Sequence, residues 1–274
     1  MLNSYKYKLN TSRDKAVTYL KRLIKYVKNG DTLNTAVSTD TDIQHEKDLE
    51  HERNVIAYYA NKKKIRMAKY ENYLKTHKIK KLQLGSASLG FKDWLNTDLE
   101  DRDEEILALD VTKKFPLKTS SIDYIFSEHL IEHVTFQEGQ VMLKECFRVL
   151  KPGGVIRTAT PNLKFLIELY TTEKKTAFQK RYIKWAVDAN LKGLGIYEDT
   201  FVINNFVRAW GHQFIYDVKI LKLALQKAGF KNIIICKPGE SEDPHLQNLE
   251  SHGTIISKDF NNYETMVLEA TKPR

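Results

Sequence analysis

The chain has 274 residues and carries 44 Lys and Arg against 35 Asp and Glu, which gives a formal net charge of +9. This length is enough to bury a full core, and a hydrophobic content of 42% is ordinary for a globular protein. No apolar run approaches the ~20 residues of a membrane helix, and the first ten residues contain no apolar signal core. We therefore expect a cytoplasmic protein without a membrane span.

The positive charge has two interpretations. It favours an anionic partner, such as nucleic acid, a phosphorylated or sialylated sugar, or a membrane surface. Lys is spread through the chain rather than gathered into one block, so solvated lysines on helix faces are the simpler explanation. Cys146 and Cys236 lie far apart without metal spacing, and we expect two buried thiols in a reducing compartment.

Residues 1–80 differ from the rest, since they contain one Gly and no Pro. Apolar spacing predicts an amphipathic helix over 12–28, a loop over 31–42 and one long or broken helix over 43–77. We expect residues 1–80 to form a helical extension, and the sequence leaves open whether it forms a homodimer or caps a site. The side chains expected to make contacts in the last helix are Val55, Ile56, Tyr59, Ile65 and Tyr73.

A glycine turn follows the first predicted strand, 81–84. Residues 85–90 read Gly-Ser-Ala-Ser-Leu-Gly, which is one residue away from the nucleotide-binding glycine pattern. Glycine in such a turn lets the backbone approach a ligand closely and leaves amide N–H groups facing it. Taken alone, the motif is equally compatible with an ordinary turn that ends a strand.

Two acids follow the next predicted strands. Asp98 lies near the end of a strand at 94–99, where a carboxylate can accept hydrogen bonds from two ribose hydroxyls. It follows the glycine turn too closely for a full helix, so we expect a truncated helix or a turn between them. Asp110 ends the segment 106–111, and its carboxylate can accept a hydrogen bond from an exocyclic amine such as that of adenine.

The stretch 121–161 organises the chain. It predicts a strand at 122–126, a polar loop at 127–133, a helix closed by Lys-Pro-Gly-Gly, and a strand at 155–159. Two strands joined by a helix imply a right-handed parallel crossover, and ligands lie beyond the carboxyl ends of such strands. The loop at 127–133 is therefore expected to border an active site. Its ionisable residues are Glu128, His129, Glu132 and His133.

The C-terminal part predicts a helix over 163–170 and a helical insertion over 171–208. The insertion is expected to cover the site and exclude water, with plain helical packing as the alternative. A helix over 217–228 follows, with Asp217 as its N-cap and Gly229 as its C-cap. Its buried face is predicted to consist of Ile220, Leu221, Leu223, Ala224 and Leu225. Strands are predicted over 230–236 and 263–270. Late strands around a single helix predict an antiparallel edge added to a parallel sheet.

Taken together, these residues resemble the class I S-adenosylmethionine-dependent methyltransferases over 81–161 and 210–272. The motifs that carry the resemblance are FSEHLIEHV, FRVLKPGGVIRTATPN and GHQFIYDVKILKLALQKAGF. The W-x-N-x-D and GES-x-D-P-H-L segments are similar to a type 11-like bacterial subgroup linked to sugar, glycan or small-molecule methylation. The resemblance implies an α/β fold: a Rossmann-like, doubly wound, mostly parallel sheet with an antiparallel C-terminal edge strand, formed by residues 81–274.

The resemblance also implies S-adenosylmethionine as cofactor and a role for each matching residue. Two departures are Ala87, where the family usually has glycine, and the short link to Asp98. The implied contacts are Gly85, Ser86 and Ala87 with the methionine part, Asp98 with the ribose, Asp110 and Val111 with the adenine, and Ser127, Glu128 and His129 with the sulfonium and the substrate entrance.

Methyl transfer to a hydroxyl benefits from a general base. His129, His133 and His212 are the candidates, because imidazole titrates near neutral pH. We favour His129, at the strand end nearest the expected methyl group; the alternative for each histidine is a structural role. The sequence shows no clear set of clustered acids, so we predict no metal.

Three classes of function remain open. The leading one is a methyltransferase that acts on an oxygen of a small molecule or glycan. The net charge of +9 favours an acceptor that is anionic. The second is a nucleic-acid (RNA) methyltransferase, motivated by the net charge and the basic segment 62–66, although the Asn/Asp-Pro-Pro-aromatic motif of many base methylators is missing. The third is a catalytically silent binding module, against which Asp98, Asp110 and Gly153-Gly154 argue. A nicotinamide-dependent dehydrogenase fits the degenerate glycines poorly.

Overall fold

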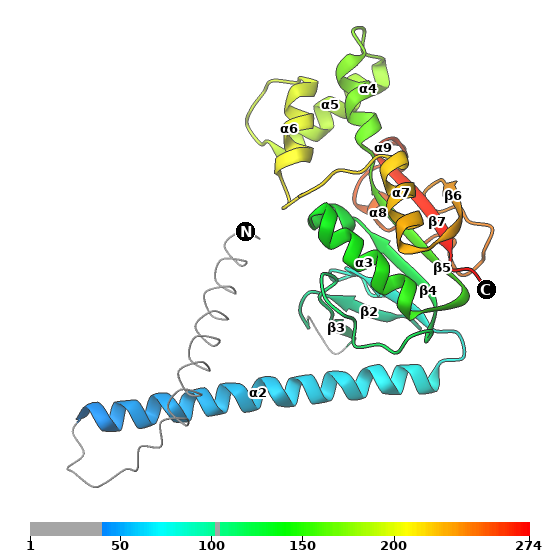
Figure 1. Ribbon diagram of the computed structural model, residues 1–274. Helices are drawn as coiled ribbons and strands as arrows, with labels where there is room; N and C mark the ends of the chain where they lie inside the picture. The colour runs from blue at the N-terminus through cyan, green and yellow to red at the C-terminus, as the bar shows by residue number, and fades with distance from the viewer. Residues whose placement is uncertain (1–39, 102–104) are drawn as a thin grey trace. The chain divides into compact units, whose positions relative to one another are not determined.

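A computed structural model of the chain describes residues 40–101 and 105–274 (Figure 1). The chain divides into two compact units, Met1–Ile65 and Arg66–Arg274. The helix predicted over 12–28 lies outside the described residues, and so does most of the loop predicted over 31–42.

Helix α2 (Asp40–Thr76) is one continuous helix, as the sequence predicts for 43–77. Of its expected contact residues, Tyr73 is buried, and its hydroxyl bonds both the amide and the carbonyl of Lys81. The other four were predicted wrongly, because their side chains are 38–65% exposed. They are Val55, Ile56, Tyr59 and Ile65. Arg66 of the basic segment makes a two-pronged ion pair with Asp101.

The second unit is built on one seven-stranded sheet, in the order β3-β2-β1-β4-β5-β7-β6. All neighbouring strands are parallel except at β7, which runs antiparallel to β5 and β6 and lies one place in from the edge. This is the predicted Rossmann-like, mostly parallel sheet, so the fold class is confirmed. The strands are β1 (Lys81–Leu84), β2 (Leu95–Asp98), β3 (Ile106–Ala108), β4 (Ile122–Glu128), β5 (Leu150–Pro161), β6 (Lys231–Cys236) and β7 (Thr265–Thr271).

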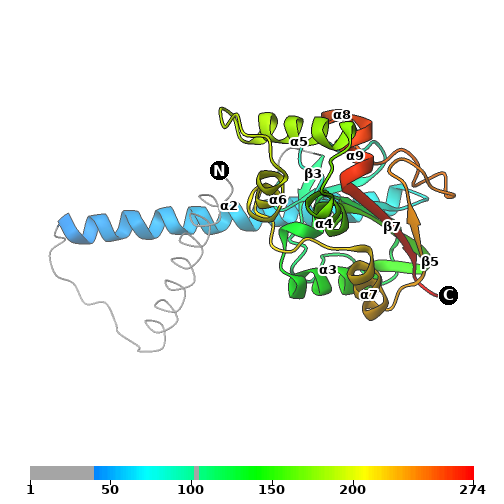
Figure 2. The same cartoon turned by 90° about the horizontal axis from the view of Figure 1, so that it is seen from above.

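Helices α3 (Phe136–Val149) and α7 (Val218–Ala228) pack on one face of the sheet and on each other (Figure 2). The predicted caps of α7 are present: Asp217 accepts the amide N–H of Ile220, and Gly229 has φ +109°. Gly229 suits this position because glycine adopts the left-handed conformation without steric cost. Leu223 was predicted as buried but is exposed.

The opposite face of the sheet is covered by loops. Trp94, Leu246 and Leu249 form a small apolar cluster there with Phe126 of β4. Of the two cysteines, Cys146 is buried in α3 as predicted, whereas Cys236 at the end of β6 is only half-buried.

A second group of helices has its own apolar core beyond the end of β5, where Figure 1 shows α4, α5 and α6. Helix α9 (Lys258–Glu264) was not predicted from the sequence, and because of it the last strand begins at Thr265 rather than 263. In the described part of the chain, no helix combines the length and apolarity that a membrane crossing requires. The remaining helices are α4 (Leu163–Thr171), α5 (Ala177–Asn190), α6 (Asp199–Arg208), α8 (His252–Ile255), α9 (Lys258–Glu264) and the short 3-10 turn η1 (Ile131–His133).

A buried arginine fixes one of the covering loops. Arg157 lies opposite Glu269 in the β5–β7 register, bonds that carboxylate at 2.5 Å and bonds Glu250 at 2.6 and 2.9 Å. It also donates to the carbonyls of Lys237 and Glu240. A cation removed from water needs such partners, so Arg157 joins the sheet to the 237–250 loop.

We predict that Arg157→Met lowers the free energy of unfolding by about 3–5 kcal/mol, because two buried carboxylates then lose their cation. Urea unfolding of the full chain measures the change. The control is Lys184→Ala, which breaks an exposed pair with Asp188 and is expected to change little. Equal effects of the two substitutions would contradict the role given to Arg157.

Candidate active site

The carboxyl ends of β1, β2 and β4 lie in register, since Leu84 pairs with both Thr97 and Ser127. The residues that follow these strands therefore meet at one edge of the sheet. Strand β4 is longer than predicted: Ser127 and Glu128 pair with Thr158 and Ala159 of β5 instead of starting a loop. The predicted loop over 127–133 reduces to two residues before η1.

In the glycine turn after β1, the side chain of Leu130 packs closely against the backbone of Gly85. Gly85 has φ +68°, and a Cβ placed on it would lie 2.9 Å from Leu130 Cδ1. Ser86 is buried, its amide donates to the carbonyl of Thr97, and its Oγ has no partner among the described residues. Ala87 adopts φ +50° although it carries a side chain. A buried hydroxyl without a partner beside a tight turn fits a polar ligand.

The two predicted acids lie on neighbouring strand ends. The carbonyl of Asp98 accepts the amide N–H of Leu109, which brings the start of the Asp110 turn beside β2. The Asp98 carboxylate accepts the amide N–H of Leu99. Asp110 accepts both donors of Thr112 and pairs with Lys113. Burial raises the pKa of Asp110, but these partners outweigh it and hold the pKa below the usual range.

The remaining residues expected around the cofactor have partners within the protein. Val111 is buried in the main core. Ser127 is fully buried, and its hydroxyl lies 3.4 Å from that of Thr158. Glu128 accepts the amide and the hydroxyl of Ser251 and the amide of His252, which fixes a distant C-terminal segment at the end of β4.

His129 is held in a left-handed conformation, with φ +47°. Its Nδ1 lies 3.1 Å from Glu132 Oε1, and its Nε2 is buried with no partner in the described parts of the chain. Burial lowers the pKa of His129, but the hydrogen bond and charge of Glu132 raise it above the ordinary value. An ionised carboxylate only accepts, so Nδ1 carries the proton and Nε2 is free to act as a base.

His252 extends this group, because its ring lies 4.3 Å from the His129 ring. Its Nε2 is 3.3 Å from Glu264, which also accepts the hydroxyl of Tyr182 from α5. No local sequence signal singled out His252, Glu264 or Tyr182.

Glu132 is fully buried at the centre of the histidines. It accepts the hydroxyl of Thr160 at 2.9 Å in addition to His129. Burial raises the pKa of Glu132, but His129 outweighs this effect and lowers it. The repeat Glu-His-x-x-Glu-His over 128–133 carried a signal for Glu132, since residues three apart on a turn lie close together.

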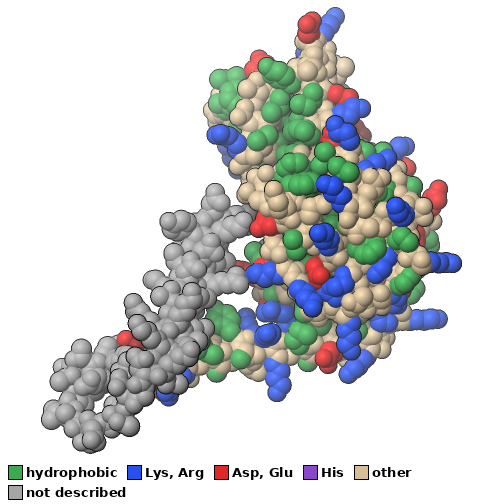
Figure 3. Space-filling view, in the orientation of Figure 1, with side chains coloured by type: hydrophobic (Ala, Val, Ile, Leu, Met, Phe, Trp, Pro, Cys, Tyr) green, Lys and Arg blue, Asp and Glu red, His purple; other side chains and the backbone are tan. Residues whose placement is uncertain are grey.

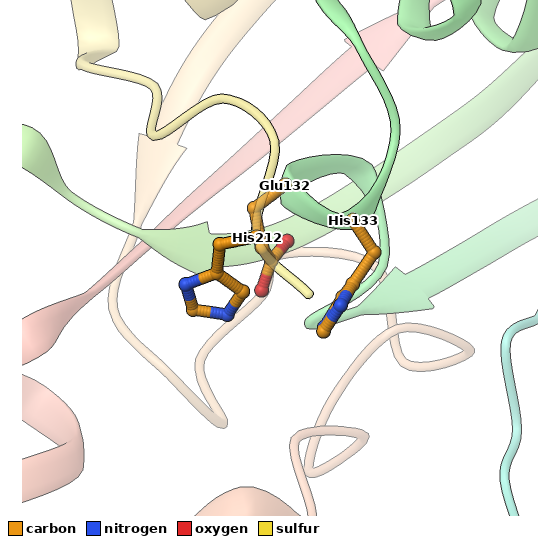
Figure 4. Close-up of side chains that lie close together, drawn as sticks. All are labelled: Glu132, His133 and His212. Carbon is orange, nitrogen blue, oxygen red and sulfur yellow. The ribbon is translucent and has the colours of Figure 1, made fainter. Parts of the chain in front are cut away.

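His133 and His212 lie together although they are far apart in sequence, with ring centres 4.9 Å apart. Figure 4 shows the Glu132 carboxylate between the two rings. The structure therefore gathers all three predicted base candidates around one carboxylate. The pKa of His212 is lowered, chiefly by burial.

A surface pocket of about 490 Å³ lies elsewhere, beside the last turns of α2 and the residues that lead into β2. It includes none of the residues predicted to bind a cofactor or to act as a base. Ligands of parallel sheets lie beyond the carboxyl ends of the strands, so we place the candidate site there and not in this pocket.

Residues 55–158 match a family model described as a methyltransferase domain, which is less than half of the chain. A stretch of 49 residues is 45% identical to a probable S-adenosylmethionine-dependent methyltransferase of Mycolicibacterium smegmatis. That stretch is 18% of this chain and 18% of the relative.

Similar solved structures have low sequence identity. A SAM-dependent methyltransferase of Archaeoglobus fulgidus is 15% identical with a TM-score of 0.40, covering 76% of this chain and 91% of that one. A possible histamine N-methyltransferase of Thermotoga maritima is 14% identical with a TM-score of 0.39, covering 79% and 95%. The phosphoethanolamine N-methyltransferase 2 of Haemonchus contortus is 13% identical with a TM-score of 0.37. The match covers 72% of this chain and 49% of that one, so the chain spans about half the length of that enzyme.

Left-handed backbone costs a residue with a side chain about 1–2 kcal/mol. We predict that Gly85→Ala lowers the free energy of unfolding by more than this, because Leu130 must also move. Gly193→Ala is the matched control, since Gly193 has φ +80° and no atom of residues 40–101 or 105–274 lies within 4 Å of the position that its Cβ would take. Thermal and urea unfolding of both variants measure the difference. A loss at Gly85 no larger than at Gly193 would show that the contact with Leu130 is unimportant.

Proposed function

We propose that this protein is an S-adenosylmethionine-dependent methyltransferase that methylates an oxygen of a small molecule or a sugar. The observation that carries the proposal is the alignment of the glycine turn, Asp98 and His129 at one sheet edge, within or beside strands that the methyltransferase-domain match covers. Fold by itself does not assign a substrate, so the acceptor class rests on the chemistry of the site.

The residues at this edge fit the cofactor. The left-handed turn at Gly85 follows the end of β1, and the buried Oγ of Ser86, which has no partner among the described residues, can bond a polar ligand there. The carboxylate of Asp98 at the end of β2 suits a pair of ribose hydroxyls, and Asp110 suits an exocyclic amine. When bound, the cofactor supplies an electrophilic methyl group on a sulfonium.

His129 is the residue that we assign as general base. Its Nε2 accepts the proton of the acceptor hydroxyl, while Glu132 holds the proton on Nδ1 and stabilises the imidazolium that forms. His133 and His212 remain alternatives for this role. His252 and Glu264 support the ring of His129 from the other side.

The acceptor is proposed to be small and anionic rather than a nucleic acid. The net charge of +9 favours an anion. On the face shown in Figure 3, Lys and Arg side chains of the second unit are scattered rather than gathered into one track. RNA methylation is the second candidate, and steep loss of binding with added salt would favour it.

We also propose that the chain consists of a catalytic domain and a helical extension. We assign catalysis to residues 81–274, with the insertion over 171–208 as a cover, and a helical extension to residues 1–80 that is a candidate for homodimer formation. The boundary between the compact units lies at Ile65, inside α2.

We predict that Asp98→Asn weakens binding of S-adenosylhomocysteine by about 10-fold or more, since a hydrogen bond to a charged group contributes about 1.5–3 kcal/mol. Calorimetric titration of the pure protein measures it, with NAD as a ligand control. Asp93→Asn removes the same charge from an exposed position before the start of β2 and is expected to bind normally. No binding by the unmodified protein, with RNA and acidic sugars present, would refute the cofactor.

We predict that His129→Gln lowers kcat by about 10²–10⁴ while leaving cofactor affinity unchanged, which is the range of general-base catalysis. Release of S-adenosylhomocysteine is followed with a panel of anionic sugars, nucleotides and RNA. His77→Gln, just after α2, is the control. A change in KM or cofactor affinity alone would instead assign His129 to binding.

A further inference from the structure

The cluster formed by Glu132, His133 and His212 has the composition of a metal site. One ligand atom of each residue lies within 4.8 Å of the others. The residues come from the η1 turn and from the segment after α6 (Figure 4). Two imidazoles and one carboxylate form a ligand set used by zinc sites that keep a fourth position for water.

The hydrogen bonds around the cluster prepare its atoms for coordination. His212 Nδ1 lies 2.5 Å from the carbonyl oxygen of Phe206, which can only accept. The proton must therefore be on Nδ1, and the lone pair of Nε2 is available. A ligating histidine almost always donates its other N–H to a carbonyl or carboxylate in this way.

Glu132 has capacity left for an ion. An ionised carboxylate offers about four acceptor positions, and the side-chain donors that reach it are His129 on Oε1 and Thr160 on Oε2. These two donors fix the orientation of the carboxylate, as outer partners of metal ligands do. The backbone carbonyl of Glu132 also accepts the amides of Gln213 and Phe214, so the two segments are already held together.

We propose that Glu132, His133 and His212 bind a divalent transition-metal ion of the zinc type. Zinc–nitrogen and zinc–oxygen bonds of about 2.0–2.2 Å require ligand atoms roughly 3.4 Å apart, so the cluster closes slightly when it binds. The ion ties the turn after β4 to the segment that leaves α6. Metal binding at this cluster does not require methyl transfer, but it leaves His129 as the general base and gives Glu132 a part in both sites. The proposal departs from the sequence-based expectation of no metal, which considered only clustered acids.

The test is direct metal binding by the full chain. The protein is stripped with a chelator, dialysed, and titrated with Zn²⁺ against a chromophoric competitor, and Co²⁺ absorption reports coordination geometry. We expect one ion per chain. His133→Ala and His212→Ala should abolish this binding. Thr160→Val removes only the hydroxyl that orients Glu132, and should weaken binding by about 10–100-fold.

His51→Ala is the control, because His51 is exposed on α2 in the other unit and should not affect the stoichiometry. Circular dichroism of each variant in chelator separates loss of the ion from loss of the fold. If a variant does not fold, Thr160→Val supplies the test. The proposal is overturned if the unmodified chain binds no stoichiometric ion in the titration, or if the His133 and His212 variants bind as it does.

Discussion

The buried carboxylate of Glu132 is the constraint on which the functional edge of the fold depends. A carboxylate without water must be neutralised and hydrogen-bonded, because the free-energy cost of leaving it bare is large. Its donors come from His129 after β4 and Thr160 in β5, and its backbone carbonyl takes the amides that follow His212. Glu132 therefore joins three separate parts of the chain, two through its carboxylate and the third through its backbone carbonyl. The left-handed backbone of His129 is strain that these contacts can hold in place.

A second buried charge, that of Arg157, fixes the position of a loop on the same sheet. Arg157 lies on the face of the sheet that loops cover. It holds these loops through ion pairs with Glu250 and Glu269 and hydrogen bonds to loop carbonyls, where no helix of the described residues packs on the sheet. Burying these groups is not in itself a gain in stability, since desolvation offsets much of the attraction. The network instead specifies where the 237–250 loop lies. Both buried charges thus act by fixing geometry around a parallel sheet whose middle strands have little contact with water.

Some of the segments that meet at the site could be predicted from the sequence, and others could not. The strand ends and the glycine turn were predicted because apolar runs, glycines and a strand-ending acid are local signals. His252 and Glu264 were missed because their importance comes from contacts with His129 and Tyr182 that no spacing reveals. The role of Glu132 was missed although it lies three residues after His129, a spacing that brings side chains together on a turn. The exposure of Leu223 and of Val55 was misjudged for a related reason: periodicity identifies an apolar face but not whether anything packs against it.

The sequence by itself determined the order and type of most elements, including the mostly parallel sheet, but not helices α8 and α9. The predicted elements follow from hydrophobic periodicity and from caps such as Asp217 and Gly229, which act within a few residues. Only the tertiary structure decided that His133 and His212 meet beside Glu132, and that the C-terminal segment supports His129. Such meetings join residues far apart in the chain, and they are fixed by sheet register and by the need to satisfy buried charges, which act only once the fold has formed.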